Sequence, residues 1–83
     1  MFYVYFLKLS NGHIYKGSTG DLRRRFHEHQ TGGVESTKHH RPLTLIGYEA
    51  YQLKSDATRR EKFLKTTEGR RLLHQQYRDI LKE

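Results

Sequence analysis

The sequence from Phe2 to Gly17, FYVYFLKLSNGHIYKG, decides the fold. The side chains of residues 2–9 follow an alternating pattern and are rich in Tyr, Val, Phe and Leu, which is typical of a strand. Asn-Gly is the strongest short-range signal for a hairpin turn, so residues 13–17 should pair antiparallel with the first strand. The chain is therefore predicted to begin with a β-hairpin that carries tyrosines on both strands.

A helix is expected directly after this hairpin. Ser18 or Thr19 is a suitable N-cap for it, and Asp21 resembles the third residue of a capping box with Asp in the place of Glu. The helix should continue to about Gln30, where a pair of glycines ends it.

The remainder of the chain predicts one more strand and two more helices. Residues 34–42 are polar and should form a loop, and residues 43–51 have the composition of a strand. Ser55 can cap a helix that continues to about Lys65. A last helix is indicated by apolar side chains that share one face, namely Leu73, Tyr77, Ile80 and Leu81. The element order is ββαβαα, and no repeat or linker divides residues 1–83 into more than one domain.

Both faces of the first and third predicted strands carry large or apolar residues. Such strands belong to a sheet that helices cover on each side, rather than to one that solvent wets. The fold class is therefore α+β, with the sheet flanked by helices. The element order does not fit a double-stranded RNA module or a ferredoxin-like RNA module.

The charge of the chain points to a polyanionic partner. Sixteen Lys and Arg residues stand against nine Asp and Glu, which leaves a formal net charge of +7. A positive field of this size steers nucleic acids toward a protein, whereas the alternative is a basic surface that only keeps the protein soluble. Nucleic acid, and DNA first of all, is therefore the expected partner, with RNA not excluded.

The absence of cysteine excludes disulfides and thiolate metal sites, and it fits the reducing cytoplasm. The apolar residues 2–7 are too few to span a bilayer and have no basic residue ahead of them, so they do not form a signal peptide. We expect a cytoplasmic protein that makes no membrane contact.

Two residues of the first predicted helix suit chemistry on a phosphodiester. Arg25 and His29 lie one turn apart, on a stripe next to the apolar pair Leu22 and Phe26. A guanidinium can hold a phosphate with two parallel hydrogen bonds, and an imidazole can exchange a proton near neutral pH. The alternative is that Arg25 is solvated and His29 only stabilises the helix dipole. The nearby tyrosines, whose phenols can relay protons, favour the functional interpretation.

Glu61 is the carboxylate expected to complete such a site. It shares a helical stripe with Ala57, Leu64 and Lys65, and a carboxylate on a buried stripe has to be paired, hydrogen-bonded or bound to a metal. One interpretation is an ion pair with Arg60, Lys65 or Arg25. The other is a ligand for one hard divalent cation, and magnesium suits a single carboxylate because it keeps several waters.

The six histidines raise the question of zinc. Without a cysteine or a matching spacing, we do not expect the four nearest candidates to form a closed zinc site; they are His27, His29, His39 and His40. The other two, His13 and His74, have no visible partner in the sequence and are expected to lie at the surface.

Taken together, these segments resemble the GIY-YIG nuclease superfamily, and especially its small single-domain bacterial members. The resemblance covers about residues 2–66 and includes several ordered motifs at suitable spacings. They are Tyr3-Val4-Tyr5-Phe6-Leu7, Asn11-Gly12, Tyr15-Lys16-Gly17-Ser18-Thr19, Leu22 with Arg25 and His29, Thr37, Arg41-Pro42, the strand from Leu45 to Tyr51, and Arg60-Glu61-Lys62. The resemblance implies a three-stranded antiparallel sheet flanked by helices, and metal-dependent hydrolysis of a phosphodiester.

The resemblance also assigns roles to five residues. Tyr5 and Tyr15 resemble the tyrosines of the first and second motifs, Arg25 the phosphate-binding arginine, and His29 the histidine one turn later. Glu61 resembles the sole protein ligand of the divalent metal, magnesium or manganese.

This sequence also departs from the family pattern. Tyr3-Val4 replaces the Gly-Ile of the first motif, so Tyr3 is an alternative to Tyr5 as the catalytic tyrosine. Lys16 replaces the apolar residue of the second motif, and no Asn follows Glu61.

The sequence thus predicts a magnesium-dependent endonuclease that acts on DNA, with branched, flapped or damaged structures as candidate substrates. Tyr5 or Tyr15 would orient or deprotonate a water for in-line attack, with help from His29. Arg25 would stabilise the charge that develops on the phosphate, and a cation on Glu61 would support the leaving 3′ oxygen, so that cleavage leaves a 5′ phosphate.

General phosphate contacts are expected from basic side chains around this site, and five are predicted: Lys16, Arg23, Arg24, Lys38 and Arg41. The alternatives to a nuclease are a non-catalytic nucleic-acid-binding module with the same fold and an interaction domain whose charge is incidental.

Overall fold

A three-stranded antiparallel sheet forms the centre of the computed structural model, which describes residues 1–83. Its strands are β1 (Phe2–Lys8), β2 (Ile14–Thr19) and β3 (Thr44–Tyr51), arranged in the order β2-β1-β3. Gly12 adopts a φ of 87° in the turn between β1 and β2, a conformation that glycine reaches without steric cost. The predicted hairpin is therefore confirmed, and β1 is the buried central strand of the sheet.

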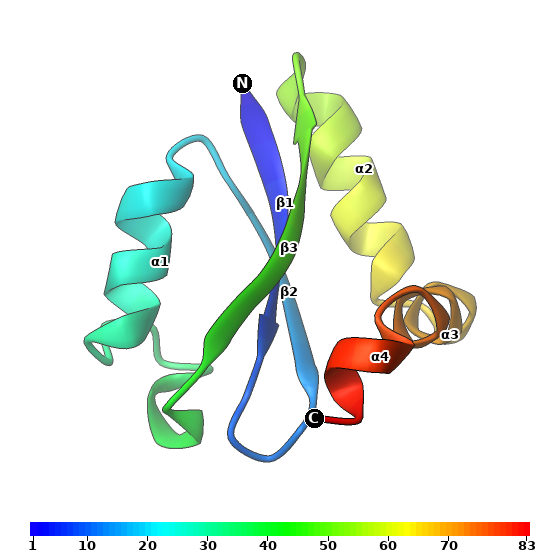
Figure 1. Cartoon of the computed structure of the whole chain (residues 1–83). Helices are drawn as coiled ribbons and strands as arrows, with labels where there is room; N and C mark the ends of the chain where they lie inside the picture. The colour runs from blue at the N-terminus through cyan, green and yellow to red at the C-terminus, as the bar shows by residue number, and fades with distance from the viewer.

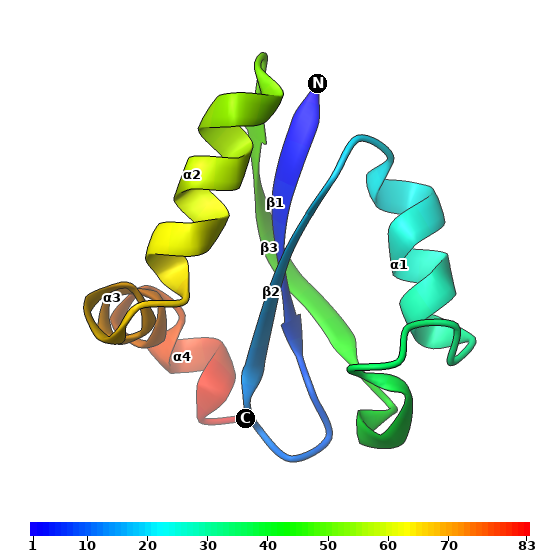
Figure 2. The same ribbon diagram turned by 180° about the vertical axis from the view of Figure 1, so that it is seen from behind.

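Helices cover both faces of the sheet (Figures 1 and 2). α1 (Leu22–Gln30) lies on one side, and α2 (Lys54–Leu64), α3 (Thr67–Gln76) and the short α4 (Arg78–Leu81) lie on the other. The expected α+β class and the order ββαβαα are confirmed. None of the helices has the length and apolar character that crossing a membrane requires.

The alternation of β1 divides the core into two halves. Val4 and Phe6 point toward α2 and α3, where they pack in a cluster with Ile14, Ala57, Leu64 and Leu73. Tyr5 and Leu7 point the other way and pack with Leu43, against the flanking side chains Leu9, Tyr15, Leu22, Phe26 and Leu45. The tyrosines of the hairpin consequently lie on the α1 side of the sheet.

The starts of the first two helices differ from the prediction. Ser18 and Thr19 still belong to β2, because Tyr3 pairs with Thr19 and keeps these residues extended. Asp21 is the N-cap of α1 instead, and its Oδ1 accepts a hydrogen bond of 3.1 Å from the backbone N–H of Arg24. Ser55 is also not a cap, since α2 begins one residue before it.

The C-terminal segment forms two helices where the pattern predicted one. The chain leaves α3 at Tyr77 and begins α4 at the next residue. Leu73 is buried, and Tyr77 and Leu81 pack on the same core, but Ile80 is 37% exposed. The predicted loop 34–42 contains a short 3₁₀ turn, Lys38–His40, and buries Val34 and Thr37.

Candidate active site

Tyr5 projects from the central strand toward α1 and is only 1% exposed. Its cross-strand partner is Gly17 on the edge strand β2. The phenol of Tyr5 lies so close over Gly17 that a methyl group at position 17 would overlap its ring and oxygen. The glycine of the second motif therefore makes room for the tyrosine of the first.

A hydrogen-bonded chain of three buried side chains continues from this phenol. The hydroxyl oxygen of Tyr5 lies 2.9 Å from Nε2 of His29, and Nδ1 of His29 lies 2.7 Å from Oγ1 of Thr37. His29 and Thr37 are both fully buried. Thr37 reaches the site from the segment between α1 and β3, and no local pattern in the sequence predicts a role for it. The only available signal was its place in the family pattern.

Burial sets the protonation states of this chain. It lowers the pKa of His29, and the positive charge of Arg25 lowers it further. Burial also raises the pKa of Tyr5, although the neighbouring guanidinium of Arg25 opposes the rise. At neutral pH the imidazole is therefore neutral and the phenol protonated. When Nδ1–H donates to Thr37, Nε2 is free to accept the proton of Tyr5.

Tyr15 completes an aromatic group with Tyr5 and His29. Its ring centroid lies 5.2 Å from that of His29 and 6.3 Å from that of Tyr5. It is half-buried, and the hydroxyl of Ser36 lies 3.5 Å from its phenol oxygen. Tyr3 takes no part, because its ring packs edge-on against Tyr48 with centroids 5.9 Å apart.

Arg25 lies at the rim of this group, with 37% of its side chain exposed. Its guanidinium forms an ion pair of 3.1 Å with Glu28, one turn further along α1. The phenol of Tyr5, and then Glu28, raise the pKa of Arg25. The exposed rim position leaves part of the guanidinium accessible to a ligand.

Glu61 projects from α2 on the opposite side of the sheet. Its Oε1 accepts a hydrogen bond of 2.6 Å from Ser18, and its Oε2 forms an ion pair of 2.7 Å with Lys65. Burial by itself would raise the pKa of Glu61, but Lys65 and Ser18 outweigh this effect and lower it. The carboxylate is therefore ionised at neutral pH, and 19% of its side chain remains exposed.

The Lys65 ion pair is one of the alternatives that the sequence had left open. Arg60 pairs with Glu49 instead, and Arg25 with Glu28. The contact with Ser18 is not predicted by the sequence, because a serine just before a helix is typical of an N-cap. The alternation of β2, which places Ser18 on the α2 side with Ile14, was the signal that could have identified it.

The structure thus brings Tyr5, Tyr15, Arg25 and His29 together on the α1 side and places Glu61 on the α2 side. Burial is the main cause of the raised pKa of Tyr5, and the negative charge of Glu61 across the sheet adds a smaller contribution in the same direction. The intervening β2 is an edge strand, and at Gly17 it carries no side chain.

The residues around Glu61 determine which metal could bind there. No three His, Asp or Glu side chains converge in this chain, so the donor set does not suit an ion that requires an all-protein site. A single ionised carboxylate next to a hydroxyl fits a magnesium ion that keeps most of its waters.

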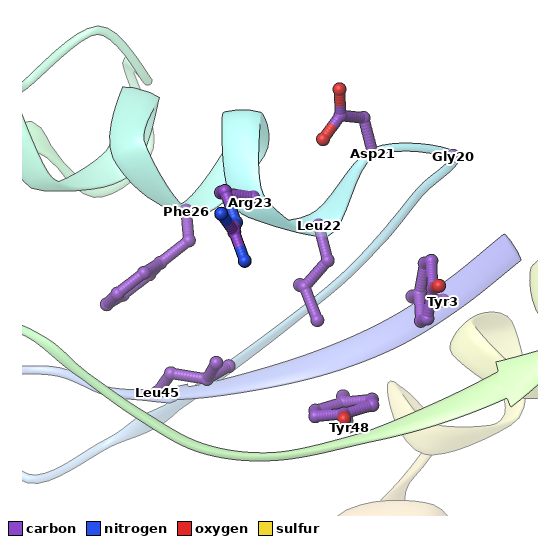
Figure 3. A pocket seen from close by; sticks show the side chains of 8 residues that line it. All are labelled: Tyr3, Gly20, Asp21, Leu22, Arg23, Phe26, Leu45 and Tyr48. Carbon is purple, nitrogen blue, oxygen red and sulfur yellow. The ribbon is translucent and has the colours of Figure 1, made fainter.

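The five predicted phosphate contacts come from different parts of the chain, namely β2, α1 and the segment between α1 and β3. Arg23 lines a cleft of about 490 Å³ between α1 and the sheet, beside Phe26, Tyr3 and Tyr48 (Figure 3). This cleft contains none of the five predicted catalytic residues. Arg24 is exposed on α1 and takes part in no ion pair.

The other three contacts have different surroundings. Lys38 pairs with Glu35 at 2.9 Å, and Arg41 donates hydrogen bonds to the backbone carbonyls of Lys38 and Gln30. Lys16 faces the α2 side of β2, and its Nζ lies 3.3 Å from the carbonyl oxygen of Ile14.

Comparisons with known proteins agree with this geometry. Residues 1–77 match the family model described as the GIY-YIG catalytic domain. A UPF0213 protein of Cupriavidus pinatubonensis is 42% identical over 60 residues, which are 71% of this chain and 67% of the relative. A UPF0213 protein of Staphylococcus aureus is 40% identical over 65 residues, which are 77% of this chain and 79% of the relative.

A solved structure is similar as well. The solution NMR structure of a UPF0213 protein from Bacillus halodurans is 32% identical in sequence, with a TM-score of 0.56. The match covers 88% of this chain and 82% of the other.

Proposed function

This chain belongs to the GIY-YIG family, and from that premise we propose that it is a divalent-metal-dependent endonuclease that hydrolyses phosphodiester bonds in DNA. The single observation that carries the proposal is the buried chain Tyr5–His29–Thr37 beside the half-exposed Arg25. Branched, flapped or damaged DNA is the substrate we favour, with RNA as a further candidate, and the cytoplasm is the proposed location.

In this proposal, Tyr5 activates the attacking water. The water gives a proton to the phenol oxygen while the phenol passes its own proton to Nε2 of His29, 2.9 Å away. The oxygen of the water attacks phosphorus and the bond to the 3′ oxygen breaks, which leaves a 5′ phosphate. The leaving 3′ oxygen takes a proton from solvent water to become a 3′ hydroxyl, and His29 afterwards returns its proton to solvent. Thr37 keeps the imidazole in the tautomer that accepts this proton. Tyr15, half-buried beside His29, is the second candidate for the tyrosine that contacts the water.

Arg25 and Glu61 take the electrostatic roles. The guanidinium of Arg25 binds the phosphate oxygens as negative charge develops on them. Because Arg25 is paired with Glu28, the guanidinium has to contact Glu28 and the phosphate at the same time. Glu61 would hold the divalent ion, magnesium or manganese, which supplies positive charge at the phosphate and the leaving oxygen. Ser18 orients Oε1 of Glu61, and Lys65 has to release Oε2 before a metal can bind there.

One observation favours the second candidate function, a non-catalytic nucleic-acid-binding module. The ion pair between Glu61 and Lys65 satisfies the carboxylate without any metal. A chain that kept this pair permanently would retain the fold and the basic surface but would not cleave DNA.

Incubation of the protein with linear, flapped and four-way-junction DNA decides between the two functions. Each substrate is tested in magnesium and in excess chelator, next to the variants Tyr5→Phe and Tyr15→Phe. Cleavage that needs both magnesium and one of these two hydroxyls supports the nuclease. Binding to DNA without cleavage of any substrate would favour the non-catalytic module.

A further inference from the structure

A second group of basic side chains gathers away from the tyrosines, between the β1–β2 hairpin and α3. A shallow pocket of about 390 Å³ lies there, lined by His13, Ile14, Lys16, Arg70 and His74. Four of these five residues carry nitrogen groups that can donate to an anion. Figures 1 and 2 show that the start of β2 and the C-terminal helices lie at the same end of the molecule.

No carboxylate compensates these groups. The six ion pairs of the chain involve Arg25, Lys38, Arg59, Arg60, Lys65 and Arg71, and none involves a residue of the pocket. Lys16 is half-buried at the base of the group, and its Nζ contacts only the carbonyl oxygen of Ile14. Burial lowers the pKa of Lys16, and the charges of Arg70 and Lys65 lower it further. Like charges crowded in this way repel one another until an anion binds among them.

The pocket is adjacent to Glu61 along the same strand. Lys16 and Ser18 are two residues apart on β2 and face the same side, and Ser18 donates to the Glu61 carboxylate. Two strand residues span about 6.6 Å. An extended nucleic-acid strand held at Glu61 therefore has its flanking backbone within reach of Lys16.

We propose that His13, Lys16, Arg70 and His74 form a phosphate-binding subsite that holds the nucleic-acid backbone beside the cut. This inference rests on the proposed function, because it places the flanking strand relative to Glu61. Lys16 can contact a phosphate in this subsite, whereas the apolar residue at the same place in the family motif has no group that binds an anion. The ligand is a phosphodiester group, and the contact reads no base.

Salt-dependent binding to DNA in chelator tests the subsite without any cleavage. The test variant is Lys16→Met together with Arg70→Gln, and the matched control is Arg59→Gln together with Arg71→Gln. Both remove two positive charges, but the control arginines lie outside the pocket, on α2 and α3. We expect the test variant to lower the slope of log K against log salt by about 1.8, since each phosphate contact on duplex DNA contributes about 0.9. The control should keep the slope of the unchanged protein.

Equal slopes for the two double variants would overturn the subsite. Thermal unfolding of each variant checks that the fold is retained, and Arg70→Gln alone offers a milder change because Arg70 is exposed. This single change should lower the slope by about 0.9, and an unchanged slope would count against the subsite.

The two proposals fail in different ways. DNA cleavage with a slope that is independent of Lys16 and Arg70 would remove the subsite and leave the nuclease. A slope that depends on this pair, without any cleavage in magnesium, would remove the nuclease and leave the subsite. NMR of labelled protein titrated with inorganic pyrophosphate locates the anion-binding site. We expect chemical-shift changes near residues 13–16 and 70–74. Changes confined to α1 would contradict the subsite.

Discussion

Gly17 lies directly opposite Tyr5 on the neighbouring strand, and the phenol of Tyr5 covers its Cα. Because position 17 has no side chain, the phenol of Tyr5 can pass over the edge strand and reach His29. The glycine is therefore part of the site, although it offers no functional group.

We expect Gly17→Ala to reduce both stability and activity. The added methyl group would force the Tyr5 ring away from His29, and overpacking of this kind costs about 1–3 kcal/mol. Thermal unfolding measures the first effect and magnesium-dependent DNA cleavage the second. Gly20→Ala is the matched control, because its methyl group would meet only Phe2 at an ordinary distance of 3.7 Å. Unchanged melting temperature and cleavage in Gly17→Ala would show that the ring has room to move.

The lowered pKa of His29 predicts how stability depends on pH. Burial keeps this imidazole neutral in the folded state, whereas in the unfolded chain it takes up a proton near pH 6.5. Below that pH the unfolded state therefore binds more protons, and the free energy of unfolding falls as the pH decreases. Urea unfolding between pH 7.5 and pH 5.5 measures this dependence.

The His29→Gln variant isolates this contribution, because Gln keeps hydrogen-bonding groups but does not titrate. Its unfolding free energy should fall less over the same pH interval than that of the unchanged protein. His27→Gln, on the same helix but exposed, is the control and should keep the original dependence. A His29→Gln curve parallel to the original would contradict the assignment.

Glu61→Gln should retain the fold and lose metal-dependent cleavage. The amide nearly preserves the shape of the side chain and can still accept a hydrogen bond from Ser18. The lost ion pair involves Lys65, which is 51% exposed, so we expect a stability cost of no more than about 1 kcal/mol. DNA binding should persist or tighten, because one negative charge is removed from a basic site.

Three measurements check this prediction: thermal unfolding, DNA binding in chelator and cleavage in magnesium. Lys65→Gln is the matched control, because it breaks the same ion pair and leaves the carboxylate in place. A stable Glu61→Gln protein that cleaves DNA at the original rate would exclude Glu61 as the metal ligand. A large loss of stability in both variants would favour a purely structural ion pair.

Arg25→Ala should reduce turnover about 100-fold or more, with a much smaller effect on DNA binding. A group that interacts with charge developing in the transition state acts on kcat rather than on ground-state affinity. Arg25→Lys should restore only part of the rate, because the planar fork of the guanidinium is lost. Single-turnover cleavage and equilibrium binding separate the two effects. Original turnover in Arg25→Lys would place Arg25 outside the site.

The environment of each basic residue predicts its effect on salt-dependent binding. Arg24 takes part in no ion pair, so Arg24→Gln should weaken binding to unrelated DNA sequences equally and lower the salt slope by about 0.9. Lys38 is already neutralised by Glu35, and Lys38→Gln should lower the slope less. An unchanged slope in Arg24→Gln would exclude this part of α1 from the DNA interface.

The sequence alone determined the hairpin, the order of the elements and most of the candidate site. Asn11-Gly12 specified the turn, and the period-two alternation of β1 specified which side chains share a face. The one-turn spacing of Arg25 and His29 placed both toward the tyrosines. These features depend on neighbours in the chain, so local periodicity and turn chemistry are sufficient to predict them.

The tertiary structure decided which distant groups meet. Ser18 could have capped a helix, but pairing of β2 with β1 keeps it extended, and it reaches Glu61, 43 residues away. Thr37 forms a hydrogen bond with His29, and His13 and His74 line the same pocket. In both cases tertiary packing brings together segments whose sequence spacing follows no helix or strand period. Such contacts depend on how α1 and α3 lie against the sheet, because buried polar groups accept whichever partner the packing of the whole chain brings within hydrogen-bonding distance.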